Sequence, residues 1–153
     1  MQEATGQAGL MNIMLTIIGI IIILLAGSIA YSKAFRVKNR IVDIIEKYNV
    51  YDNNSATEIE NALTDIGYRT MKKTEYLSRC NSKKFSGFTL DTTSYPSHMY
   101  CIYKAKSKDS YYYKVVTYMY FDLPVVGNFI QIPVTGETKM LYSKSTAEWK
   151  TVK

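Results

Sequence analysis

The sequence predicts an α+β protein in which one long N-terminal helix carries a small antiparallel β-sheet. Three observations lead to this prediction: an uncharged apolar run near the N-terminus, a helical stripe of apolar residues directly after it, and tyrosine-rich segments of alternating character in the C-terminal half. With 153 residues, the chain has room for one domain beside the apolar run. We divide it into an N-terminal tail (residues 1–9), a transmembrane helix (10–30), an amphipathic helical extension (31–48) and a small α+β domain (49–153).

The transmembrane helix is predicted from the run LMNIMLTIIGIIIILLAGSIA at residues 10–30, which contains no charged residue. A helix of this length rises about 31 Å, close to the hydrocarbon thickness of a bilayer. A chain this small could not surround a helix that is apolar on every face, so we expect lipid contact. The anchoring side chains include Ile13, Ile17, Ile20, Ile23 and Leu25. A cleaved signal peptide is the alternative, because Ser28-Ile29-Ala30 resembles a cleavage site, but no Lys or Arg precedes the run.

Basic residues flank the C-terminal end of this helix and leave its orientation open. All 19 Lys and Arg residues follow the apolar run, and four follow it closely: Lys33, Arg36, Lys38 and Arg40. The positive-inside rule places this end of the helix in the cytoplasm. A basic surface also suits an anionic partner such as lipid headgroups. We expect no nucleic-acid partner, since no basic-aromatic motif of the RNA-binding kinds occurs.

The membrane helix is expected to continue without a break to residue 48. An apolar stripe of helical period runs through Val37, Ile41, Ile44, Ile45 and Tyr48, and the other face carries Lys33, Arg36, Arg40, Asp43 and Lys47. A turn at Asp52-Asn53-Asn54 then precedes a short second helix. We expect Ser55 as its N-cap with Glu58 as the capping-box partner, and Gly67 as the residue that ends it.

Beyond Gly67 the chain is expected to be extended. Residues 68–77 and 85–90 are weak strand candidates. Residues 98–106 and 111–121 are the strongest pair, joined by a hairpin turn at Ser107-Lys108-Asp109-Ser110, and one face of the second strand is more apolar than the other. Residues 129–134 and 138–142 form either one bulged strand or a hairpin around Gly136.

Cys80 and Cys101 are the two cysteines of the chain, and both fall in segments predicted to be extended. They do not form a C-x-x-C pair and have no histidine nearby, so they do not indicate a zinc site. A disulfide would close a loop of about twenty residues and stabilise the fold by about 3 kcal/mol. It would also imply an oxidising compartment. Two buried free thiols are the alternative.

The chain has few residues suited to catalysis. Its one histidine, His98, lies shortly after Pro96 at the start of a predicted strand, where a surface or packing role is expected rather than general-base chemistry. Motifs for nucleotide binding, zinc proteases and serine hydrolases do not occur, and no carboxylates fall at metal-ligand spacing. We therefore expect no catalytic site, no cofactor and no metal.

Tyrosine is unusually abundant, with 14 residues concentrated in the predicted strands. Tyrosine suits a half-buried pleated surface, so core packing is one interpretation. Tyrosine is also enriched where proteins meet, and the second strong strand carries it on both faces. The sequence leaves both interpretations open, with Tyr112, Tyr118 and Tyr120 as the candidate interface residues.

The layout resembles type IV pilin-like proteins, in particular the small single-pass pseudopilins of tight-adherence (Tad-type) systems. The resemblance is carried by the apolar helix that runs into an amphipathic half (residues 10–48), by the small domain ending in antiparallel strands, and by the segment FDLPVVGNFIQIPVTGETKMLY (residues 121–142). It implies that the helix is stored in the membrane and packs into a filament core on assembly. No basic residue precedes Gly6 or Gly9, and the acid that this family carries five residues into the mature helix is missing after either glycine, which favours a minor subunit that stays anchored.

These observations together predict a non-enzymatic structural subunit of an extracytoplasmic filament or secretion apparatus. Its partners would be membrane lipid and copies of itself or related subunits. The alternative is a cytoplasm-facing binding module, in which Lys33, Arg36, Lys38 and Arg40 bind anionic lipid and the domain recruits a soluble protein.

Overall fold

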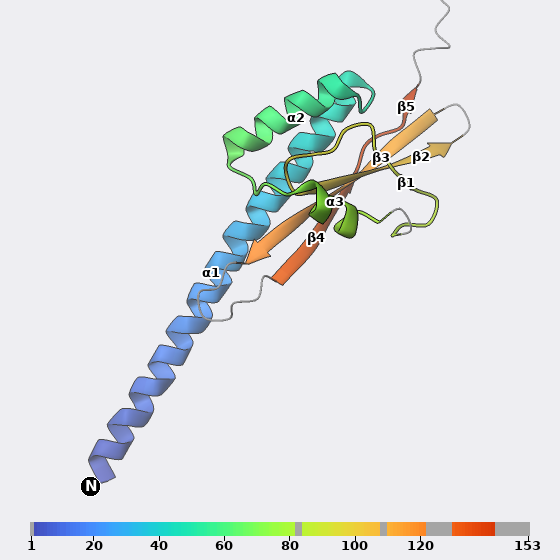
Figure 1. The fold of residues 1–153 in the computed structure, drawn as a ribbon. Coiled ribbons are helices and arrows are strands. Elements are labelled where there is room, and N and C mark those ends of the chain that lie inside the picture. The colour runs from blue at the N-terminus through green and yellow to red at the C-terminus, as the bar shows by residue number, and fades with distance from the viewer. Residues whose placement is uncertain (1, 82–83, 108–109, 122–129, 143–153) are drawn as a thin grey trace, which may run out of the picture.

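A computed structural model describes residues 2–81, 84–107, 110–121 and 130–142, with side chains for all of these except residues 2–8, 121, 130 and 131. The predicted α+β class is confirmed (Figure 1). Three helices, α1 (Gln2–Tyr48), α2 (Asn53–Ile66) and α3 (Lys73–Arg79), accompany one antiparallel sheet. Its strands are β1 (Thr89–Leu90), β2 (Tyr100–Ser107), β3 (Ser110–Phe121), β4 (Ile130–Glu137) and β5 (Leu141–Tyr142).

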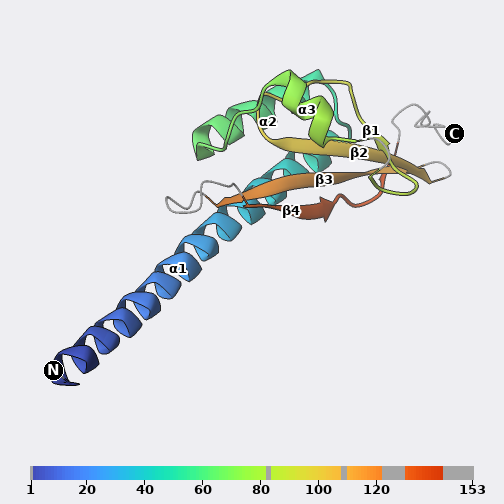
Figure 2. The same cartoon turned by 60° about the horizontal axis from the view of Figure 1, so that its bottom comes forward.

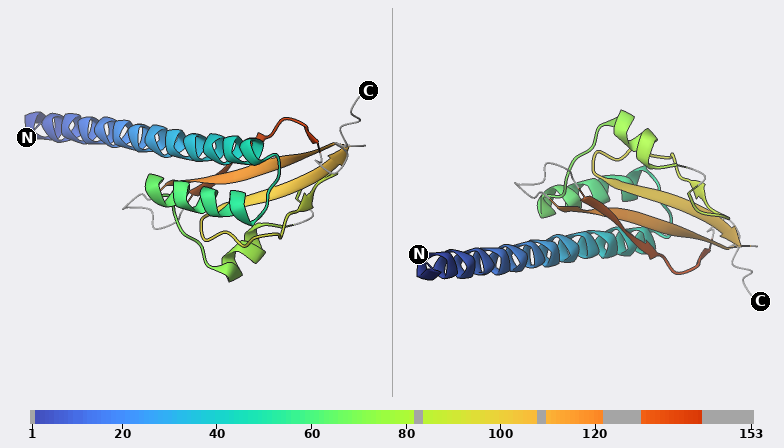
Figure 3. Two further views of the ribbon diagram at one scale, coloured as in Figure 1. Left: turned by 90° about the horizontal axis from the view of Figure 1, so that it is seen from above. Right: turned by 90° about the horizontal axis from the view of Figure 1, so that it is seen from below.

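One unbroken helix of 47 residues forms both the predicted membrane segment and one wall of the domain. Figures 1 and 3 show its N-terminal half projecting away from everything else. The predicted apolar stripe is confirmed, because Val37, Ile41, Ile44 and Ile45 are at most 1% exposed. The helix begins at Gln2, so the segment 2–9, which we expected as a tail before the membrane helix, is itself helical. This segment contains no proline, and each of its two glycines costs a helix only about 1 kcal/mol.

Helix α2 begins earlier than predicted, with Asp52 as its N-cap. The Asp52 carboxylate accepts from the Ser55 backbone N–H at 2.8 Å, and the Ser55 hydroxyl accepts from the Asp52 N–H at 2.8 Å. Ser55 is therefore the partner within the capping box rather than the cap, because the acid three residues earlier performs the capping role equally well. The same Ser55 N–H holds the pKa of the Asp52 carboxyl below its ordinary value of 3.8. Gly67 ends the helix as predicted, with a left-handed φ of 64°.

The sheet has the order β1-β2-β3-β4, with β5 also paired to β3. The predicted hairpin is confirmed, since β2 and β3 pair in antiparallel register from Tyr100↔Thr117 to Ser107↔Ser110. Both β4 and β5 run antiparallel to β3, so residues 130–142 form one interrupted strand rather than a hairpin around Gly136. At the interruption, the Thr138 N–H donates to the Tyr113 carbonyl and the Thr138 hydroxyl accepts from the Tyr113 N–H.

Residues 68–77 do not form the predicted strand. Thr70 makes only an isolated bridge to His98, and α3 follows at Lys73–Arg79. Helix α3 has Glu75 in its first turn and Arg79 in its last, and both charges interact favourably with the helix dipole. The two side chains also form an ion pair at 3.0 Å. It also brings Tyr76 into the core, at 1% exposure. Of the second weak candidate, residues 85–90, only the two residues of β1 are extended.

Both faces of β3 are covered, whereas the sequence predicted one apolar face. Thr117 faces α1, and its hydroxyl donates to the Ala34 carbonyl at 3.3 Å. The alternate residues face the segment before β1, where the ring of Tyr112 meets Phe88 with centroids 5.3 Å apart. Helices α1 and α2 pack side by side, as Figures 2 and 3 show. The sheet is thus held between α1 on one face and, on the other, an aromatic segment without regular structure together with α3, which the Cys80–Cys101 bond ties to that face.

Candidate functional site at the junction of anchor and domain

No described part of the chain packs against the apolar half of α1. Its large side chains from Leu10 to Leu25 are between 46% and 68% exposed. They include the five predicted anchor residues, Ile13, Ile17, Ile20, Ile23 and Leu25. Among the described residues, α1 is the one helix long and apolar enough to cross a membrane. Exposing this much apolar surface to water is costly, so the helix is a single-pass membrane anchor.

A groove of about 650 Å³ lies where the anchor meets the domain. One wall is the segment of α1 from Ala26 to Ala34. The other is made by the turn after α2, which includes Arg69, and by Tyr118 and Tyr120 near the end of β3. A second hollow of about 540 Å³ shares Ile29 and Lys33 with it, and its further lining residues are Ser28, Ser32, Arg36 and Ile66.

The four basic residues predicted as one cluster have different surroundings. The Lys33 ammonium donates to the Gly67 carbonyl at 2.6 Å, at the C-terminal end of α2 where a cation is favourable. Lys38 lies elsewhere, with its ammonium 4.1 Å from the centre of the Phe35 ring and its stem against Gly136. Arg36 and Arg40 are exposed, and Arg36 lines the second hollow.

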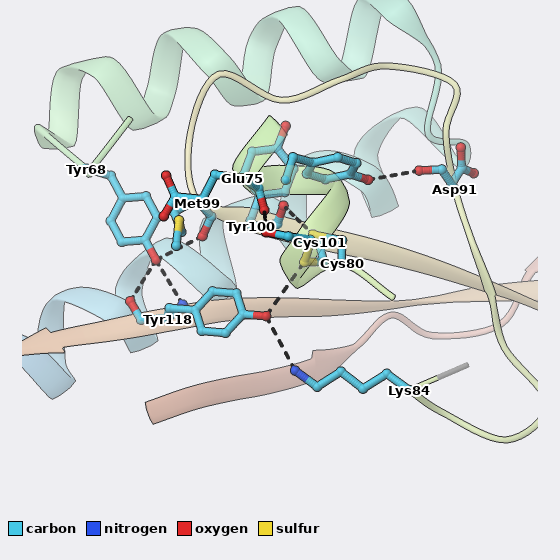
Figure 4. The surroundings of a disulfide bond; sticks show 11 residues. Tyr68, Glu75, Cys80, Lys84, Asp91, Met99, Tyr100, Cys101 and Tyr118 are labelled. Carbon is cyan, nitrogen blue, oxygen red and sulfur yellow. Dashed lines mark hydrogen bonds between the residues drawn. A yellow bond between two sulfur atoms is a disulfide. The ribbon is translucent and has the colours of Figure 1, made fainter. Parts of the chain in front are cut away.

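The predicted disulfide between Cys80 and Cys101 is confirmed, with a Cα–Cα distance of 5.6 Å (Figure 4). Both cysteines are at most 2% exposed. Cys80 is the C-cap of α3 rather than part of a strand, so the bond ties that short helix to β2. Closing a loop of this size stabilises the fold by about 3 kcal/mol. The Tyr118 hydroxyl lies 3.8 Å from the Cys101 sulfur and accepts from the Lys84 ammonium at 3.4 Å.

The candidate interface tyrosines belong largely to the interior. Tyr118 is only 6% exposed, so its prediction as a lateral contact is wrong. Its backbone is held by Tyr68, whose hydroxyl donates to the Tyr118 carbonyl at 2.8 Å and accepts from its N–H at 2.9 Å. Tyr112 and Tyr120 are half-buried. Tyr120 contacts the Tyr68 ring, and the Arg69 guanidinium lies 5.0 Å from its ring centre.

Glu60 joins α2 to the start of β2 through three polar contacts, and no sequence pattern pointed to it. Its carboxylate accepts from the Ser97 N–H at 3.2 Å and from the Tyr100 hydroxyl at 3.0 Å. Its second oxygen lies 2.7 Å from Nδ1 of His98. His98 is 4% exposed and lines neither the groove nor the second hollow. The arrangement cross-links two elements and leaves the imidazole enclosed.

Within the described ranges, no group of three or more His, Cys, Asp or Glu residues is placed to hold a metal ion. Comparison with protein-family models, with curated proteins and with solved structures found no match to the chain. The fold and the site therefore define its class by themselves: a single-pass α+β protein with a pilin-like layout and one disulfide.

Replacing Glu60 by Ala should destabilise the protein by about 2 kcal/mol or more, because the Ser97 N–H and the Tyr100 hydroxyl lose their acceptor. Glu58→Ala is the matched control, since it removes an exposed pair with Lys47 that contributes less than about 1 kcal/mol. Thermal unfolding of the full chain in detergent, followed by circular dichroism, measures both. Equal losses for the two variants would contradict the assigned role of Glu60.

Alkaline pH should unfold the protein through its tyrosines. Burial raises the pKa of Tyr51 and Tyr68 from 10.0 to about 12. The unfolded chain therefore loses these protons first, so stability is complete below pH 10 and falls as the pH rises toward 12. Tyrosinate absorbance should rise in two steps, with the second coinciding with unfolding. Tyr68→Phe should reduce the amplitude of the second step. A single absorbance step while the protein stays folded would refute the link between unfolding and the ionisation of Tyr51 and Tyr68.

Proposed function

We propose that this protein is a non-enzymatic, membrane-anchored structural subunit of an extracytoplasmic filament or secretion apparatus. The observation that carries the proposal is the buried Cys80–Cys101 disulfide in a domain built directly onto an apolar helix. Disulfides form and persist in oxidising compartments, which supports a domain outside the cytoplasm. The expected partners are membrane lipid and copies of this chain or of related subunits.

The exposure of the anchor on every side supports an assembly role. Helices in a membrane associate through van der Waals packing, and small residues let their backbones approach. Gly19 lies in the middle of the exposed run, and a Cβ added there would meet nothing within 4 Å. In the domain, exposed apolar side chains follow the β4–β5 edge of the sheet: Ile132, Met140 and Tyr142. We assign lateral contacts to this edge in place of the buried Tyr118.

A second candidate is the cytoplasm-facing module that recruits a protein partner to anionic membrane. The observation that favours it is the exposure of Arg36 and Arg40 directly after the apolar run, since basic residues mark the cytoplasmic end of a membrane helix. The two candidates differ in the side of the membrane on which the domain lies, so topology separates them.

A cysteine placed on the domain surface should be labelled from outside the cell. Thr92 is exposed, so Thr92→Cys should react with a membrane-impermeant maleimide in intact cells. The native cysteines give little background because both are bonded and buried. Gln2→Cys, at the other end of α1, is the control and should react only after the cells are opened. The reverse pattern would contradict the proposal and support the recruiting module.

Assembly should bring equivalent positions of neighbouring anchors together. Single cysteines at Ile13, Ile17, Ile20 and Ile23 are expected to give intermolecular disulfides on oxidation of membranes, strongest at positions that share one helix face. Asn61→Cys, exposed on α2, serves as the control for random collision. A monomeric anchor would give either no cross-link or the same low yield at all four positions. Either result would contradict the assembly role.

A further inference from the structure

We propose that the domain rests on the bilayer through a surface on the β4 side of the anchor, and that this surface inserts into the headgroup region. It consists of Tyr31, Phe35 and Lys38 of α1 together with Ile132 of β4, and we call it the interfacial surface. The proposal rests on the membrane anchoring described above. It requires neither filament assembly nor a particular orientation of the domain.

Two exposed aromatic rings follow the uncharged apolar run on one face of α1. Tyr31 is 53% exposed and Phe35 is 43% exposed, and their rings stack with centroids 6.2 Å apart. They lie about 1.5 Å and about 7.5 Å beyond Ala30 along the helix axis, and the headgroup region of one leaflet is about 5–8 Å thick. Tyrosine is enriched at this depth of membrane proteins. The two rings therefore continue the lipid-facing surface of the anchor into the headgroups.

Lys38 adds a positive charge to the same face of α1. Its stem lies against Gly136 of β4, and its ammonium lies 4.1 Å from the centre of the Phe35 ring. Phe35 is almost one helical turn nearer the membrane, so the ammonium points toward the headgroups. A lysine that covers apolar surface with its stem and carries its charge to the interface suits the phosphate groups of lipids.

Ile132 lies at the same depth, at the membrane end of the sheet. Thr117 of β3 donates to the Ala34 carbonyl and pairs with Val134 of β4, so Val134 is about level with Ala34. Ile132 is two residues nearer the start of β4, about 7 Å along the strand, which corresponds to about four residues of helix. Figure 1 shows β3 and β4 running alongside α1, with the start of β4 toward its N-terminal half. Ile132 is therefore at the level of Ala30, where the apolar run ends.

Ile132 also lies on the side of the anchor that carries the two rings. Alternate residues of a strand share a face, so Ile132 is on the same face of β4 as Gly136, against which Lys38 packs. Ile132 is 44% exposed. Covering such an apolar side chain with lipid is favourable, so the bilayer gains a contact with the sheet as well as with the helix.

A second copy of the chain is a poorer occupant for this surface. Contacts between membrane helices favour small residues, because lipid tails are as apolar as the side chains they would replace. The interfacial surface instead carries two large rings and a charge. The β4–β5 edge is then divided: Ile132 contacts the bilayer, and Met140 and Tyr142 remain for the lateral contacts proposed above.

Tryptophan fluorescence of the full chain in phospholipid vesicles tests the proposal, in a Trp149→Phe background that leaves no other tryptophan. Ile132→Trp should emit at short wavelength and lose most of its intensity when the lipids are brominated near the top of their acyl chains. Met140→Trp is the matched control on the same edge, because the neighbouring Lys139 N–H donates to Glu46, about 24 Å beyond the apolar run. Its intensity should not change. Equal quenching at both positions, or none at Ile132→Trp, would overturn the proposal.

Dilution of the protein in lipid separates the bilayer from a second copy as the occupant. The short-wavelength emission and the quenching of Ile132→Trp should both persist when the ratio of lipid to protein is raised. If a second copy covered this position, bromine would not quench the emission, and dilution would shift it to longer wavelength. That result would overturn the proposal.

Removal of the aromatic pair tests its part in holding the domain at this depth. Tyr31→Ser combined with Phe35→Ser should reduce the quenching of Ile132→Trp. Leu77→Ser combined with Tyr95→Ser, which removes two exposed apolar side chains elsewhere on the domain, should leave the quenching unchanged. Equal quenching with and without the pair would overturn its assignment to the interfacial surface. Measurements in dilute vesicles depend neither on topology in the cell nor on cross-linking of the anchor, so failure here and failure of the proposed function are distinguishable.

Discussion

The structure depends on the packing of one helical stripe against a sheet. Ile41, Ile44 and Ile45 of α1 are fully buried, and each such side chain contributes about 2 kcal/mol relative to exposure. The same helix carries exposed isoleucine and leucine from Leu10 to Leu25. Neither glycine nor proline occurs between residues 28 and 48, so the backbone offers no hinge between the two environments. The height of the domain above the bilayer therefore follows from the position of the anchor.

The abundance of tyrosine is explained in part by backbone hydrogen bonding, because tyrosine hydroxyls pair with backbone groups where helices and strands end. The Tyr113 hydroxyl accepts from the Tyr51 N–H at 3.2 Å, just after α1 ends. In the same region, the Tyr111 hydroxyl donates to the Asn49 carbonyl at 2.8 Å. Buried backbone groups outside helices and ladders need such partners, because an unmatched one costs about 1–3 kcal/mol. A large ring with a polar tip fills the core and also supplies that partner.

The sequence predicted the features that local periodicity and turn chemistry determine. The stripe from Val37 to Ile45 has a period that only a helix satisfies, and Gly67 occupies a left-handed position that favours glycine. The β2–β3 hairpin followed from two long segments around a short polar turn. Each of these signals lies within about a dozen residues, so no knowledge of distant contacts was needed.

The remaining features are decided by contacts between distant residues. Helix α3 has only seven residues, too few to be stable alone, and the burial of Tyr76 and the Cys80 disulfide hold it in place. Alternation along β3 placed Tyr118 on one face but could not tell a core from an interface, because the aromatic segment that covers that face is irregular. The groove could not be predicted from the sequence either, since its walls come from α1, from the turn after α2 and from β3.

The groove keeps its shape because its walls are held to one another. Helix α2 is tied to α1 near both ends, through the Lys33 contact to Gly67 and through the ion pair of Lys47 with Glu58 at 2.9 Å. The turn that lines the groove follows α2 directly, so the position of α2 sets the width of the groove. The walls of the groove are thus fixed by contacts between residues that lie far apart in the sequence, and no local pattern could have indicated them.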